Sequence, residues 1–105
     1  MSKTNKFGLK KEDMEYMHQV FKQFPEINKV LVYGSRARGD FKNGSDVDLA
    51  LYGKNINFDI VSAVHLKLEQ ESAMPFLFDV HHYESLTNSK LKKEIDQFGV
   101  LIYGD

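Results

Sequence analysis

A glycine-rich stretch, GSRARGDFKNGS at residues 34–45, lies between two short segments that have the character of β-strands. The first segment, KVLVY at 29–33, is an apolar run typical of a buried strand. The second, DVDLALY at 46–52, alternates between polar and apolar residues, as a strand does when one face is buried. The sequence therefore predicts two strands joined by a glycine-containing loop, and the rest of the chain must pack around them.

Apolar residues recur at helical spacing in three other places, and one further apolar run has strand character. On the last helix we expect Leu91, Ile95 and Phe98 to face inward, with Asn88 as the cap and Gly99 as the stop. The expected helices cover 14–24 (closed by Pro25), 57–72 and 88–98, the third strand covers 74–83, and 100–103 forms a small edge strand or a docked tail.

This order of elements predicts a single domain over residues 1–105 of α/β or α+β class. We expect a small mixed sheet of three to four strands, with helices packed on one face. The composition, 42% hydrophobic and 28% charged, is ordinary for a globular protein. No apolar run approaches the ~20 residues of a membrane helix, and the first residues lack the apolar core of a signal peptide, so we expect a cytoplasmic protein.

The charge and cysteine content exclude several kinds of site. With no cysteine, the chain has no disulfide, thiolate metal site or cysteine nucleophile. A net charge of −1 argues against a protein that coats nucleic acid, and we expect no direct nucleic-acid binding. Residues 1–42 carry nine basic and five acidic side chains, and residues 43–105 carry five basic and ten acidic ones. This asymmetry is either chance or a sign that some of the acids are metal ligands.

Three aspartates are the candidate catalytic and metal-binding residues. Asp46 and Asp48 share one face of their strand, where two adjacent carboxylates repel each other unless a cation lies between them. If the strand at 74–83 is a neighbour with its polar face aligned, Asp79 joins them, as in a two-metal phosphoryl-transfer site. Oxygen ligands suit Mg²⁺ or Mn²⁺. The alternatives are a solvated strand face or turn for Asp46 and Asp48, and a paired structural aspartate for Asp79.

The turn after the first strand offers the complementary half of such a site. Gly34 lets the backbone approach a ligand closely, and the Ser35 hydroxyl can bond a phosphate oxygen. Arg36 and Arg38 place two guanidinium groups on the same loop, where they are suited to bind phosphate. The alternative for each is an ordinary charged side chain of a surface loop. Phosphate-binding groups beside carboxylates that hold metal ions indicate a nucleoside triphosphate site.

The same residues carry a family resemblance. GSRARGDFKNGSDVDLAL is similar to the Gly-Ser-x10-Asp-x-Asp signature of the DNA polymerase beta-like nucleotidyltransferase superfamily. More narrowly, the chain resembles the minimal nucleotidyltransferases that act as antitoxins of HEPN-family toxins. The resemblance implies the nucleotidyltransferase fold, triphosphate binding by Gly34 and Ser35, two Mg²⁺ ions on Asp46 and Asp48, and Asp79 as the third carboxylate.

The resemblance also implies an activity and a partner. The expected reaction transfers a nucleoside monophosphate, AMP from ATP, to a hydroxyl, and the expected acceptor is a tyrosine of a helical HEPN-type toxin, which is silenced. We also expect that the chain can associate with copies of itself. Two alternatives remain open: a non-catalytic, nucleotide-sensing module that neutralises its partner by binding, and a small-molecule nucleotidyltransferase that works with a separate helical subunit.

Overall fold

Four strands form one mixed sheet in the order β3-β2-β1-β4. The structure, a computed structural model, describes residues 5–104. Strands β2 and β3 are parallel, whereas β1 is antiparallel to both β2 and β4. In chain order the elements are α1 (Lys11–Lys22), β1 (Lys29–Tyr33), α2 (Gly34–Arg38), β2 (Val47–Tyr52), α3 (Phe58–Glu69), β3 (Phe78–His82), the 3-10 turn η1 (Tyr83–Ser85), α4 (Ser89–Phe98) and β4 (Val100–Gly104).

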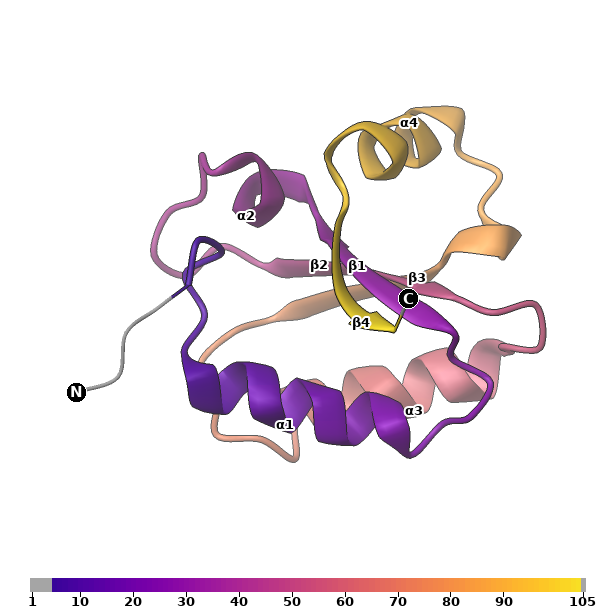
Figure 1. Ribbon diagram of the computed structural model, residues 1–105, viewed down its shortest axis with the longest axis horizontal. Coiled ribbons are helices and arrows are strands. Elements are labelled where there is room, and N and C mark those ends of the chain that lie inside the picture. Colours follow the sequence, from indigo (N-terminus) through magenta and orange to yellow (C-terminus); the bar gives the residue numbers. More distant parts are fainter. Residues whose placement is uncertain (1–4, 105) are drawn as a thin grey trace.

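The main core lies between one face of the sheet and helices α1 and α3 (Figure 1). Alternate residues of β1 and β2 point into it, because successive side chains of a strand face opposite ways. The fully buried members from the sheet and the two helices include Met17, Val20, Phe21, Val30, Val32, Val47, Leu49, Leu51, Val64 and Leu68. This layer fixes the register of β1 against β2, since a slip by one residue would expose the whole apolar set.

The opposite face of the sheet is covered by α4, with α2 beside it (Figure 1). Tyr33, Ala50 and Ile95 form a second, smaller buried cluster there. The α+β class and the mixed sheet are thus confirmed, but the expectation that helices cover only one face is wrong. The reason is that β2 is buried on both faces: Ala50 is as fully buried as Leu49 and Leu51, so each face needs a helical cover.

The ends of the elements follow local capping chemistry. The Asn57 side chain accepts a hydrogen bond from the Ile60 amide at the start of α3, and Asn88 accepts two at the start of α4. VLIY is confirmed as an edge strand, paired with β1. Phe98, expected to face inward, is instead 36% exposed at the end of α4. The longest helices have 12 residues, and none within 5–104 is long and apolar enough to cross a membrane.

Candidate active site

The strand register places two of the predicted aspartates side by side. Asp48 lies opposite Tyr33 of β1 on one side and opposite Asp79 of β3 on the other. All three side chains emerge on the face covered by α4, because directly paired residues share a face of the sheet. Asp46 precedes β2 by one residue, so it lies just outside the strand that was predicted to include it.

These residues line one open pocket of about 610 Å³ at the ends of β1 and β2. The predicted residues Gly34, Ser35, Arg38, Asp46, Asp48 and Asp79 all contribute to it. The pocket therefore brings together the residue types that bind phosphate and the three carboxylates. Of the residues proposed from sequence, only Arg36 is not part of its lining.

The electrostatics of the pocket centre on Asp48. Burial, and then the nearby carboxylates of Asp79 and Asp46, raise the pKa of Asp48 to about 6, while His81 and Arg38 act in the opposite direction. Placing carboxylates this close together without a compensating cation is unfavourable. The pocket is therefore suited to positive charge.

The donor chemistry fits a hard divalent cation, since three carboxylates in one pocket are the oxygen ligands that Mg²⁺ and Mn²⁺ take. As the side chains lie, no group of three or more His, Cys, Asp or Glu residues between 5 and 104 is arranged to hold a metal ion. One of the three carboxylates already has a partner, because Asp79 Oδ1 lies 3.1 Å from His81 Nε2.

Gly34 is the point of closest approach between the turn and the carboxylates. Its φ is +74°, and a Cβ placed on it would lie 2.2 Å from Asp48 Oδ2. Both the backbone conformation and the space therefore require glycine at this position. Gly34 and Ser35 are the first two residues of α2, so this short helix begins directly against the carboxylate of Asp48.

We expect Gly34→Ala to destabilise the protein by about 2–4 kcal/mol, since a left-handed non-glycine residue costs about 1–2 kcal/mol and the contact with Asp48 adds strain. Gly39→Ala is the matched control: Gly39 also has a positive φ, of +91°, but a Cβ at that position would meet no atom within 4 Å. Urea denaturation of both variants measures the difference. Equal losses of stability would contradict the contact with Asp48.

Arg38 connects the short helix that begins at the Gly34-Ser35 turn to α4. Its guanidinium pairs with Glu94, a residue of α4, and its Nε donates to Asp40 Oδ2 at 3.3 Å. The side chain is 34% exposed and lines the pocket, so it remains available to an anionic ligand. Glu94 was not foreseen from sequence, because its place at the pocket depends on how α4 docks.

Arg36 is placed differently from the sequence expectation. It is 2% exposed, and its guanidinium donates to the carbonyl oxygens of Phe7, at 2.7 Å, and Ser45, at 2.8 and 3.2 Å. The rings of Phe41 and Phe76 lie 4.9 and 4.6 Å from its central carbon. The side chain thus connects the segment before α1 to the loop that carries Asp46, and it stabilises that loop without lining the pocket.

Sequence reasoning missed Leu91 and Glu94, which line the pocket from α4. They are spaced i, i+3 and so share one side of the helix. That spacing alone carries no functional signal, since amphipathic helices commonly show it. Only the docking of α4 on the sheet brings them to the site.

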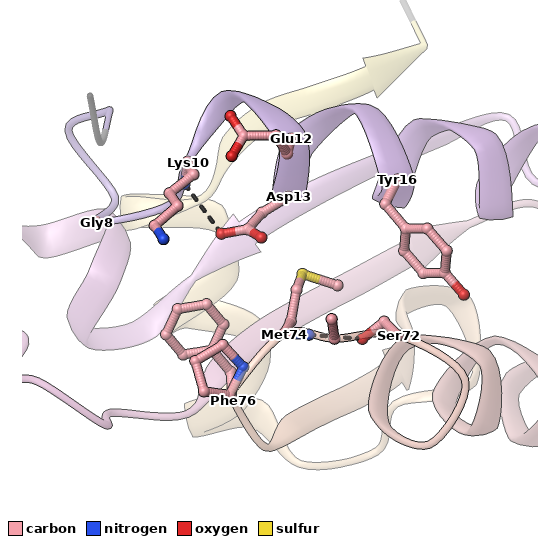
Figure 2. Close-up of a pocket in the computed structure, with 10 residues that line it drawn as sticks. Gly8, Lys10, Glu12, Asp13, Tyr16, Ser72, Met74 and Phe76 are labelled. Carbon is pink, nitrogen blue, oxygen red and sulfur yellow. Dashed lines mark hydrogen bonds between the residues drawn. The ribbon is translucent and has the colours of Figure 1, made fainter. Parts of the chain in front are cut away.

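A second pocket, of about 370 Å³, lies between the start of α1 and the segment before β3 (Figure 2). Lys10, Asp13, Tyr16 and Phe76 are among its lining residues. The amide of Lys10 donates to Asp13 Oδ2 at 3.0 Å, as in a capped helix start. None of the predicted site residues lines this pocket, so the candidate chemistry belongs to the face covered by α4.

The raised pKa of Asp48 predicts a pH dependence of stability in the metal-free protein. Between its ordinary value of 3.8 and about 6, the folded protein binds more protons than the unfolded chain does. The free energy of unfolding should therefore fall as pH rises through this window, by roughly 1–3 kcal/mol. Urea denaturation in EDTA at pH 4 to 7 measures it. Asp48→Asn should remove this component, and parallel profiles for variant and wild type would contradict the assignment.

Comparisons with known proteins identify the family and the fold of this chain. A family model described as "Polymerase beta, Nucleotidyltransferase" matches residues 15–105. No curated protein matches the sequence. A chain of a toxin–antitoxin complex solved with AMP-PNP superposes with a TM-score of 0.73 at 18% identity, covering 88% of this chain and 73% of that one.

Two further solved structures share the fold. A chain of a complex between a tri-AMPylated Shewanella oneidensis HEPN toxin and an MNT antitoxin gives a TM-score of 0.67 at 16% identity, covering 90% of this chain and 71% of that one. A putative nucleotidyltransferase from Sulfolobus solfataricus gives 0.51 at 20% identity, covering 96% and 89%. With the family model matching most of its length, this chain belongs to the polymerase beta nucleotidyltransferase family.

Proposed function

We propose that this protein transfers AMP from ATP to a tyrosine hydroxyl of a helical HEPN-type toxin and thereby acts as its antitoxin. The observation that carries the proposal is the pocket that combines the Gly34-Ser35 turn with Asp46, Asp48 and Asp79 in a chain of this family. The superposed chains from toxin–antitoxin complexes, one solved with AMP-PNP and one containing an AMPylated toxin, support the choice of nucleotide and partner.

In this proposal, different residues hold the triphosphate and the metal ions. The backbone of Gly34 and the hydroxyl of Ser35 bind the triphosphate, and the guanidinium of Arg38 contributes positive charge beside them. Asp46, Asp48 and Asp79 would hold two Mg²⁺ ions. When bound, the ions would activate the acceptor hydroxyl and offset the negative charge on the leaving pyrophosphate.

The transfer itself is an in-line displacement at the α-phosphorus. Asp79, whose side chain is 55% exposed, takes the proton of the acceptor hydroxyl. The hydroxyl oxygen bonds to the α-phosphorus as the bond to the β-phosphate oxygen breaks, so pyrophosphate leaves and AMP stays on the acceptor. The protein supplies positioning and electrostatic stabilisation, which dominate phosphoryl transfer.

An open pocket also suits an acceptor delivered by another protein. The carboxylates lie at the starts of β2 and β3, where the pocket is open and the side chain of Asp79 is half-exposed. A tyrosine presented on the surface of a partner helix can therefore approach the α-phosphate without a rearrangement of the sheet.

Intact mass spectrometry of the co-expressed partner tests the proposal. The probe is a helical HEPN-type protein, co-expressed and purified with wild-type protein and with the Asp46→Ala/Asp48→Ala variant, then incubated with ATP and Mg²⁺. We expect the partner to gain one or more AMP units with the wild type only. A stable complex with both versions and no gain in mass would instead indicate the non-catalytic binding module.

A further inference from the structure

Tyr33 is the last residue of β1, directly before the Gly34-Ser35 turn. Its side chain lies on the face covered by α4 and packs with Ala50 and Ile95. The residue is 3% exposed, and its strand partner across the sheet is Asp48. Tyr33 therefore occupies the boundary between the buried cluster under α4 and the pocket that contains the aspartates.

The hydroxyl of Tyr33 is a buried polar group without a partner. Among residues 5–104 it is the one buried side-chain oxygen or nitrogen that makes no hydrogen bond to another described group. By contrast, the Tyr16 hydroxyl donates to the carbonyl oxygen of Lys67 and the Tyr83 hydroxyl donates to Asp96. Because an unpaired buried hydroxyl costs free energy, phenylalanine would be the favoured residue here if packing were the sole role of the side chain.

The surroundings of the hydroxyl define what it can do. Tyr33 lines the same pocket as Asp48, Asp79 and Glu94. A phenol is protonated at neutral pH, so the Tyr33 hydroxyl is a neutral hydrogen-bond donor, which neither repels an anion nor competes for a cation.

We propose that Tyr33 is a positioning residue whose hydroxyl donates a hydrogen bond to an oxygen of the nucleotide bound in this pocket. The inference rests on the proposed function and deepens it. Phosphate and sugar oxygens are strong acceptors. Because the hydroxyl is closed off from solvent in the free protein, the bond requires the side chain to turn toward the pocket when the nucleotide binds. The cost of the unpaired hydroxyl in the free protein is then recovered when the nucleotide binds.

The test separates binding from folding by removing the hydroxyl alone. We expect Tyr33→Phe to bind AMP-PNP with Mg²⁺ about tenfold more weakly than wild type, as for a lost hydrogen bond to a charged ligand. The melting temperature of the ligand-free variant should equal or exceed that of wild type, since a buried unpaired group is gone. Isothermal titration calorimetry and thermal denaturation give the two readouts.

Tyr52→Phe is the matched control, because Tyr52 lies on the same face of the sheet, stacked on Tyr83, and does not line the pocket. It should bind AMP-PNP as wild type does. Equal affinities for Tyr33→Phe and wild type would overturn the inference. A lowered melting temperature of the ligand-free Tyr33→Phe variant would also overturn it, by showing that the hydroxyl is already satisfied in the free protein.

The two proposals fail in different ways. If wild-type protein does not bind AMP-PNP, the proposed function fails and the role of Tyr33 fails with it. If wild type binds AMP-PNP and Tyr33→Phe binds it equally well, only the role of Tyr33 is lost. If wild type and Tyr52→Phe bind AMP-PNP equally well and Tyr33→Phe binds it more weakly, both the proposed function and the role of Tyr33 are supported.

Discussion

Asp48→Asn should abolish nucleotidyl transfer and at the same time stabilise the metal-free protein at neutral pH. Asp48 lies between Tyr33 and Asp79 in the sheet, and its pKa is raised to about 6 by burial and by neighbouring carboxylates. Loss of this ligand removes several kcal/mol of charge stabilisation, so we expect transfer to fall roughly 10³-fold. Without metal, the uncharged amide relieves the repulsion and should raise the free energy of unfolding by roughly 1–3 kcal/mol at pH 7.5.

The opposite signs of the two effects distinguish a functional carboxylate from a structural one. A structural aspartate would lose stability when it is replaced, and its replacement would lower activity through unfolding. Asp40→Asn is the matched control, because Asp40 pairs with Arg38 but does not line the pocket. It should change stability by less than about 1 kcal/mol, as for an exposed ion pair. Full transfer by Asp48→Asn would exclude the proposed chemistry.

Arg36→Ala should cost about 3–5 kcal/mol of stability, enough to unfold much of the population of a small domain. The change leaves the carbonyl oxygens of Phe7 and Ser45 without their donor and opens a cavity between two aromatic rings. Buried groups that lose a partner are costly, and the lost packing adds to that cost. Circular dichroism during thermal denaturation measures the effect.

Arg38→Ala provides the comparison from the same short helix. Arg38 is partly exposed, so its ion pairs with Asp40 and Glu94 should contribute little to stability. We expect this variant to fold and to bind triphosphate more weakly. If Arg36→Ala were as stable as Arg38→Ala and impaired only in triphosphate binding, the sequence-based expectation of a phosphate contact by Arg36 would be restored.

The contrast between these two arginines shows where sequence reasoning stops. Both follow Ser35 within three residues, and both look equally suited to phosphate. Their positions differ because two residues far away in the chain, Phe7 and Phe76, contact Arg36 and help to bury it. No local pattern carries that information, since it depends on the packing of the segment before α1 against the segment before β3.

Other features could be predicted because they depend on local periodicity. The alternation over 46–52 was enough to place Asp48 on one face of β2 and the core residues Leu49 and Leu51 on the other. The cap at Asn88 follows from its residue type. The second helical layer was harder to foresee, although its signal was present: Ala50 breaks the polar face of β2. A strand with apolar residues on both faces requires cover on both.

The parallel pairing of β2 and β3 sets Asp48 directly against Asp79. Neighbouring strands are ~4.8 Å apart, so the separation of these two carboxylates follows from the backbone ladder and hardly depends on the side chains beneath it. The sheet thus sets the backbone spacing of the two candidate metal ligands. Conservative changes among the core residues on the other face of the sheet should therefore leave the spacing of Asp48 and Asp79 unchanged.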